Sequence, residues 1–215
     1  MARLPERALE VLRDPLAHPE QLSLVETNET QLHVLAAAAY FQQTNFTRGS
    51  ELLETEIARH PADNELLASA TQAYLMRGLF ANALGVIDRR LRLVPDDPAW
   101  LYTKGYVSIQ LKNYETAITV LSRVLAMQTN NNDALFNRAI ANLDSEHLDA
   151  ARADYLRLQR SYSNSFQVAY GLGEIAWRQH DTNEAVRNYA IYLANANTNS
   201  GEAKTVLERL RELKK

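Results

Sequence analysis

The chain has 215 residues, with 23 Lys and Arg against 26 Asp and Glu, and it contains no cysteine. A net charge of −3 lacks the basic excess typical of nucleic-acid binding, so we expect no nucleic-acid partner. The absence of cysteine excludes disulfides, thiolate catalysis and cysteine-based zinc sites, while a hydrophobic fraction of 46% is ordinary for a folded protein.

The first 29 residues predict a short helix over residues 5–13 (PERALEVLR), followed by a connection that prolines interrupt. Charged residues break any apolar core of the signal-peptide type in this segment. The most apolar stretch of the chain, residues 32–41, is well short of the ~20 residues that a membrane-spanning helix needs. We therefore expect no membrane insertion and a cytoplasmic protein, or a periplasmic or extracellular one if an export signal has been removed.

A period of 34 residues runs from residue 30 to residue 199. Tyr114 and Ala117 match Phe80 and Ala83 one period earlier. The eighth position of each unit holds a small residue: Ala37, Thr71, Gly105, Ala139 and Gly173. The period divides this part of the chain into five units, residues 30–63, 64–97, 98–131, 132–165 and 166–199.

Apolar residues within each unit recur at spacings of three and four, which is the periodicity of a helix and not of a strand. The sequence therefore predicts an all-α protein with two helices in each unit. We expect the first helices at residues 30–43, 64–77, 98–111, 132–145 and 166–179. We expect the second helices at residues 46–59, 80–93, 114–127, 148–161 and 182–195.

A further amphipathic helix is predicted over residues 200–213, because Val206, Leu207 and Leu210 fall on one stripe. Asn199 is its expected N-cap, with Glu202 three residues on. We expect residues 200–215 to form a C-terminal capping helix that shields the last unit.

This pattern resembles the tetratricopeptide repeat, whose unit is a helix–turn–helix with small and aromatic residues at these offsets. The resemblance covers residues 30–199 and implies a right-handed α-solenoid in which the first helices line the concave face. It also implies a scaffold for protein–protein interaction that is not an enzyme. Residues 1–29 are out of register, so they are either an N-terminal cap or the remnant of a longer array.

In this family the second, fifth, ninth, twelfth and thirteenth residues of the first helices point into the concave face. Here the fifth position carries aromatic rings on three successive helices, at Tyr102, Phe136 and Tyr170. Two interpretations stay open: the rings bind a peptide of a partner, or neighbouring first helices pack through them. The predicted peptide-binding groove consists of Phe41, Gln72, Met76, Tyr102, Tyr106, Gln110, Phe136, Asn137, Asp144, Tyr170, Glu174, Trp177 and Arg178.

Few sequence patterns suggest a metal, cofactor or catalytic site. The five histidines have no metal-ligand spacing. Residues 171–176 read as GxGxxA, but no parallel sheet is expected around them, and a dinucleotide site requires one. Gly173 occupies the small-residue position, which favours helix packing. Lys104 and Arg138 stand at a usually apolar position. Either their charged ends reach the groove edge or they contact an acidic group of a ligand, and we expect the first. We expect no catalytic residue, cofactor or metal.

A second hypothesis makes the chain a segment of a larger array or an assembly subunit. If residues 1–29 do not cap the repeats, apolar surface around Phe46 and Leu53 would join a neighbouring segment or drive homo-oligomerisation through the N-terminal edge.

Overall fold

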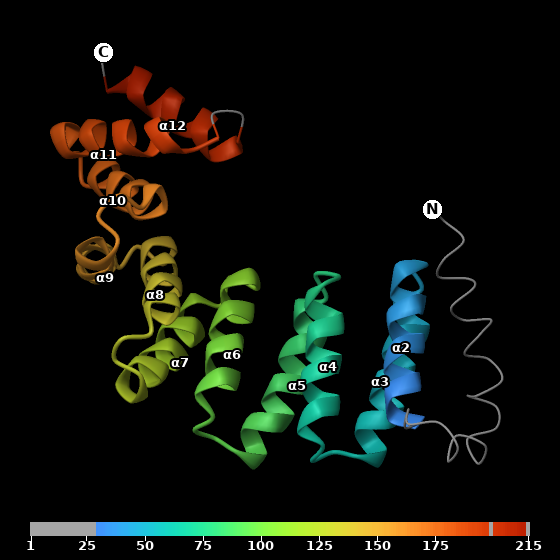
Figure 1. Cartoon of the computed structure of the whole chain (residues 1–215). Helices are drawn as coiled ribbons and strands as arrows, with labels where there is room; N and C mark the ends of the chain where they lie inside the picture. The colour runs from blue at the N-terminus through green and yellow to red at the C-terminus, as the bar shows by residue number, and fades with distance from the viewer. Residues whose placement is uncertain (1–28, 198–199, 214–215) are drawn as a thin grey trace. The chain divides into compact units, whose positions relative to one another are not determined.

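The computed structural model describes residues 29–197 and 200–213, and within these residues it contains eleven α-helices and no strand (Figure 1). The first helices of the units are α2 (Glu29–Gln42), α4 (Asn64–Leu75), α6 (Pro98–Gln110), α8 (Asn132–Asp144) and α10 (Phe166–Arg178). The second helices are α3 (Phe46–Arg59), α5 (Phe80–Leu93), α7 (Tyr114–Met127), α9 (Leu148–Ser161) and α11 (Thr182–Asn195), and α12 (Gly201–Glu212) follows.

The all-α prediction is therefore confirmed. Every second helix begins and ends at the predicted residue, and each first helix ends one or two residues earlier than predicted. The helix predicted over residues 5–13 lies outside the described residues. The N-cap of α12 was predicted one residue too early: Ser200 caps this helix, and its Oγ accepts a hydrogen bond from the Ala203 N–H at 3.1 Å.

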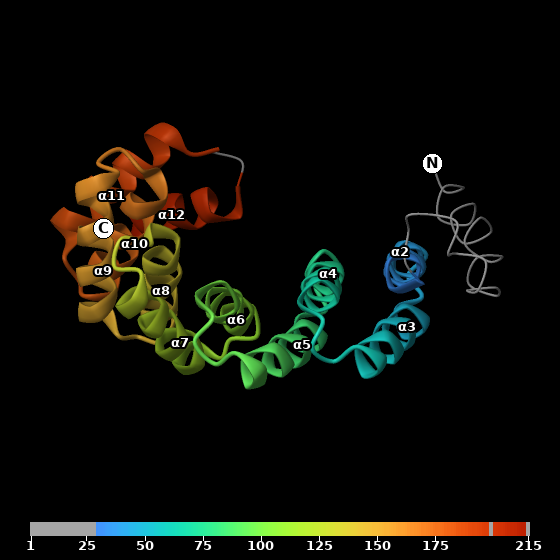
Figure 2. The same ribbon diagram turned by 60° about the horizontal axis from the view of Figure 1, so that its bottom comes forward.

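The chain divides into two compact units, Met1–Trp100 and Leu101–Lys215, which are described separately below. In the first unit α2 packs on α3 and α4 on α5, and α4 also contacts α2 and α3. In the second unit α8 packs on α9 and α10 on α11, and α10 contacts both helices of the preceding pair. Figures 1 and 2 show α8, α10 and α12 on the same side of the second unit.

A left-handed residue lies in the turn inside every helix pair. The five are Thr44, Gly78, Lys112, Glu146 and His180, which are 34 residues apart and have φ between 60° and 69°. The next residue donates its N–H to the carbonyl five residues back, as Asn45 does to Tyr40 at 2.9 Å and Asp181 does to Ala176 at 2.8 Å. This Schellman arrangement ends the first helix and reverses the chain. Sequence analysis missed it because only one of the five residues is glycine.

The small residue at the eighth position allows the two helices of a pair to approach closely. A Cβ added to Gly105 would lie 2.5 Å from Leu121 Cγ, and one added to Gly173 would lie 2.6 Å from Tyr189 Cδ1. A Cβ at Gly171 would collide with the ring of Tyr155. Gly171 and Gly173 thus serve packing inside α10, which confirms the helix-packing interpretation of the GxGxxA pattern.

We predict that Gly173→Ala lowers the free energy of unfolding by about 1–3 kcal/mol, because the fully buried Tyr189 ring has no room to move. Gly85→Ala is the matched control: its Cβ would meet nothing within 4 Å in α5, so it should raise the free energy of unfolding by about 0.5–1 kcal/mol. Urea titration followed by circular dichroism measures both. A Gly173→Ala protein as stable as the parent would contradict the close approach.

We also predict opposite effects of glycine at two turns. Gly78→Ala should lower the free energy of unfolding by about 1–2 kcal/mol, because alanine is strained at a φ of 69°. Thr44→Gly should raise it by less than ~1 kcal/mol, since relief of a β-branched residue at positive φ exceeds the entropy cost of glycine. Thermal unfolding tests both, with Gly201→Ala as the control at an open position. Equal stability of Gly78→Ala and the parent would refute the turn assignment.

Candidate peptide-binding site

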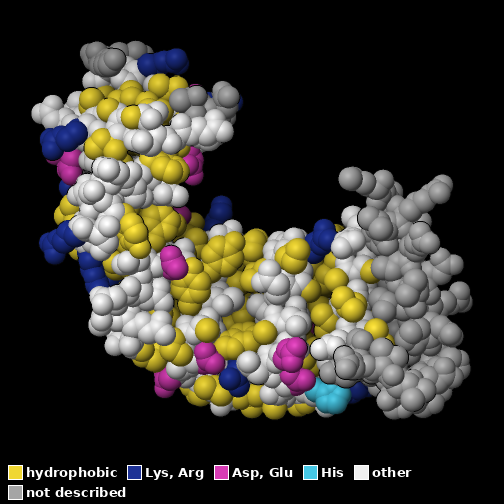
Figure 3. All heavy atoms as spheres, in the orientation of Figure 1, with side chains coloured by type: hydrophobic (Ala, Val, Ile, Leu, Met, Phe, Trp, Pro, Cys, Tyr) yellow, Lys and Arg dark blue, Asp and Glu magenta, His cyan; other side chains and the backbone are white. Residues whose placement is uncertain are grey.

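The first helices of the second unit carry accessible aromatic side chains. Tyr106 on α6 is 38% exposed, and Tyr102 lies one helical turn before it. Asn137 on α8 donates from Nδ2 to the hydroxyl of Tyr102 at 3.1 Å, which links the two helices across this face. Gln110 is exposed at the end of α6. Figure 3 shows hydrophobic side chains gathered over α6 and α8.

A cleft of about 370 Å³ is lined by residues of the five helices from α8 to α12. We call it the aromatic cleft, and it is lined by Phe136, Ile140, Leu143, Asp144, Tyr155, Gln167, Tyr170, Tyr192 and Glu202. Phe136 meets Tyr155 edge-on with ring centroids 6.1 Å apart, and the rings of Tyr170 and Tyr192 are 5.2 Å apart. Tyr155 and Tyr192 are buried, whereas Phe136 and Tyr170 are half-buried and present ring surface to the cleft.

The charge of the cleft lining is negative. Its two ionisable carboxyl groups belong to Asp144 and Glu202, and none of the described residues that line it is Lys or Arg. The Tyr192 hydroxyl donates to Glu202 Oε2 at 3.2 Å. Loss of water around the Asp144 carboxyl group raises its pKa, and the nearby charge of Arg178 partly opposes this rise. Burial also raises the pKa of Tyr155 and Tyr170, so these phenols stay neutral at physiological pH.

The predicted peptide contact at Glu174 is wrong, because α12 covers it. Glu174 is 3% exposed and forms an ion pair with Arg209 of α12, and the Tyr189 hydroxyl donates to Glu174 Oε1 at 2.8 Å. The Arg209 guanidinium carbon also lies 4.1 Å from the centre of the Trp177 ring. Trp177 thus holds α12 in place. Sequence analysis proposed α12 as a capping helix but did not foresee that α12 contacts Glu174 and Trp177 of α10.

Two further arginines serve internal contacts. Arg178 donates from Nη1 to the Leu143 carbonyl at 2.6 Å and to Glu146 at 2.8 Å, so it joins α10 to the end of α8. Arg138 donates to both carboxylate oxygens of the buried Asp154, at 2.8 and 2.7 Å. The prediction that Arg138 reaches the groove edge is therefore wrong, since a buried carboxylate on α9 requires its charge.

Three predicted groove residues lie in the first unit. Phe41 is 1% exposed, and its ring packs 5.6 Å from that of Tyr74, so the prediction of an accessible Phe41 is wrong. Gln72 and Met76 are exposed. At the predicted N-terminal edge Phe46 is exposed, but Leu53 is fully buried and contributes no edge surface.

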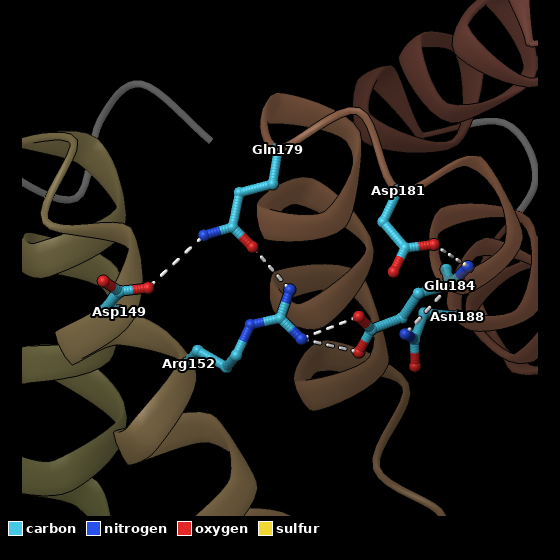
Figure 4. A network of polar contacts seen from close by, with 6 residues as sticks. All are labelled: Asp149, Arg152, Gln179, Asp181, Glu184 and Asn188. Carbon is cyan, nitrogen blue, oxygen red and sulfur yellow. Dashed lines mark hydrogen bonds and ion pairs between the residues drawn. The ribbon is translucent and has the colours of Figure 1, made fainter.

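A polar network connects α9 with α10 and α11 (Figure 4). Arg152 donates from Nη1 to both carboxylate oxygens of Glu184, at 2.8 and 2.7 Å, and from Nη2 to Gln179 at 2.7 Å. Gln179 in turn reaches Asp149 at 3.5 Å. The network fixes one helix pair against the next and so helps to position the walls of the aromatic cleft. Its partners are up to 32 residues apart in sequence, which is why sequence analysis missed it.

Within the described ranges, no three His, Asp or Glu side chains are grouped so that they could hold a metal ion. None of the helices there is long and apolar enough to cross a membrane.

Family models place the chain in a known class. The tetratricopeptide repeat model matches residues 34–98, 72–134, 102–166 and 136–202. The protein therefore belongs to the tetratricopeptide repeat family, whose fold is an α-solenoid and whose general role is protein–protein interaction. No curated protein matches the sequence.

Solved structures show the same fold at low sequence identity. MamA (residues 41 to the end) from Desulfovibrio magneticus RS-1 is 19% identical with a TM-score of 0.64, over 86% of this chain and 97% of that chain. YrrB, described as a TPR protein with an unusual peptide-binding site, is 13% identical with a TM-score of 0.66, over 89% and 98%. PilW, described as a widely conserved type IV pilus biogenesis factor, is 12% identical with a TM-score of 0.61, over 87% and 91%.

We predict that Arg209→Ala lowers the free energy of unfolding by about 2–4 kcal/mol, because it leaves Glu174 buried without its cation. The double variant Glu174→Gln/Arg209→Met should recover most of this loss, since it removes both charges. Arg211→Ala, an exposed position on the same helix, should change stability by less than ~0.5 kcal/mol. Chemical denaturation compares the four proteins. Equal losses for Arg209→Ala and Arg211→Ala would show that the buried pair does not hold α12.

Proposed function

We propose that this protein is a non-enzymatic scaffold that binds a peptide segment of a partner protein along α6, α8 and the aromatic cleft of its second unit. The observation that carries the proposal is the run of accessible aromatic side chains on three successive first helices: Tyr102, Tyr106, Phe136 and Tyr170. YrrB, which has the same fold, is described as having a peptide-binding site, and this likeness supports the same use of the fold here.

The chemistry of these side chains suits a peptide. Tyrosine buries a large apolar ring at low cost in side-chain entropy, and its hydroxyl group can hydrogen-bond the peptide backbone. Exposed Gln110 adds an amide beside Tyr106. In the first unit, Gln72 and Met76 are the exposed members of the predicted groove, and we retain them as proposed peptide contacts.

The proposal includes the organisation of the chain and its setting. We propose that residues 30–199 form five tetratricopeptide repeats and that residues 200–215 form the C-terminal cap. The choice between an N-terminal cap and a partial repeat for residues 1–29 falls on residues 1–28, which lie outside the described residues. We further propose a cytoplasmic location and a protein partner, without nucleic acid.

Peptide selection tests the proposed function. We expect a library of random peptides displayed on phage to yield binders to the whole chain, and Tyr106→Glu to weaken the selected peptides by roughly tenfold or more, as loss of an aromatic contact at an interface does. Leu156→Glu is the matched control, because Leu156 on the second helix α9 is 40% exposed, close to the 38% of Tyr106. Dissociation constants from fluorescence anisotropy give the comparison, with circular dichroism as the check on folding.

If the selected peptides bind Tyr106→Glu as tightly as the parent but lose affinity for Leu156→Glu, the binding site lies on the second helices. If no peptide is selected, this scaffold does not bind short segments and the proposed function fails.

A further inference from the structure

The two carboxylates of the aromatic cleft are not explained by helix stability alone. Asp144 is the last residue of α8, at the negative end of the helix dipole, where an acidic side chain is unfavourable. Glu202 stands in the first turn of α12, where an acidic residue is favourable, yet its side chain also lines the cleft. Both groups therefore bring negative charge to one hollow whose remaining walls are largely aromatic.

Two arginines that act on the residues of this hollow already have partners. Arg178 is bound to Glu146 and to the Leu143 carbonyl, and Arg209 is bound to Glu174. Lys112 acts on Asp144 through its charge but does not line the cleft. The cleft therefore keeps a negative charge, because Asp144 and Glu202 are exposed at its wall and none of its lining residues is Lys or Arg.

The chain itself shows how such surroundings hold an arginine. Beside the cleft, Arg209 lies over the ring of Trp177 and pairs with Glu174, and it donates to the Tyr189 hydroxyl at 3.2 Å. The same three kinds of group, an aromatic face, a carboxylate and a tyrosine hydroxyl, line the aromatic cleft, but none of its lining residues supplies the cation.

We propose that the aromatic cleft binds an arginine or lysine side chain of the partner peptide, with its methylene stem against Phe136 and Tyr170 and its charged end at Asp144 and Glu202. The proposal rests on the proposed peptide-binding function and specifies the peptide: it is basic at one anchor residue. Aromatic faces attract cations, and charged hydrogen bonds to carboxylates are among the strongest in proteins. A volume of about 370 Å³ accommodates such a side chain together with the adjoining backbone.

The test uses the peptides selected on the whole chain. We expect them to share one Arg or Lys, and we expect Asp144→Asn/Glu202→Gln to weaken their binding by roughly tenfold or more. These substitutions keep the shape of the side chains and leave Glu202 an oxygen that can still accept from Tyr192. Glu208→Gln is the matched control, because it removes one negative charge from an exposed position of α12, the helix that carries Glu202.

Replacing the shared arginine of a selected peptide by neutral citrulline completes a double-mutant cycle. We expect citrulline to weaken binding to the parent protein but not to Asp144→Asn/Glu202→Gln. We also expect added salt to weaken binding only between the parent protein and the arginine peptide. For a peptide with lysine, norleucine serves in the same way.

The outcomes separate the two proposals. Selected peptides that depend on Tyr106 but share no basic residue, or that bind Asp144→Asn/Glu202→Gln as tightly as the parent, would overturn the basic anchor and leave the proposed function standing. An apolar residue shared by those peptides would identify the cleft as an apolar pocket instead. If no peptide is selected, the proposed function and the basic anchor fail together.

Discussion

Within each of the two units, a helix pair leaves an apolar face that a neighbouring pair covers, and this dependence governs the structure of the unit. Within a pair, the small residue at the eighth position brings the helices together, as Gly173 does beneath the Tyr189 ring. Between pairs, α10 contacts both α8 and α9. Helix α12 covers the last described pair, where Ala203 and Val206 are buried against Tyr189 and Tyr192. A substitution that disturbs the packing of one pair is therefore expected to destabilise the neighbouring pairs.

Helix α12 also shapes the proposed site. Because α12 occupies the place where a further first helix would stack, it covers Glu174 and engages Trp177. The same position brings Glu202 to the wall of the aromatic cleft. One helix thus closes the apolar face of the last pair and completes a cleft that the repeats by themselves would leave open on one side.

Arginine side chains tie the second unit together. Arg138, Arg152 and Arg178 each pair with a carboxylate 16 to 32 residues away in sequence and so connect different helical pairs or the two helices of one pair. These ion pairs neutralise arginine side chains inside the fold, while the carboxylates of Asp144 and Glu202 line the cleft. The negative character of the proposed peptide site therefore follows from how the fold distributes its ion pairs, and the overall charge of −3 does not reveal it.

The sequence by itself determined the helices, their period and the family, because helical periodicity and the small residues at fixed offsets are local properties of the chain. It also supplied Tyr102, Tyr106, Phe136 and Tyr170 as candidates. Only the tertiary structure decided which candidates stay accessible: Phe41 and Glu174 became buried, and Glu202 joined the cleft from outside the repeats. Burial and ion pairing depend on residues distant in sequence, such as Arg209 for Glu174, and no local pattern records them.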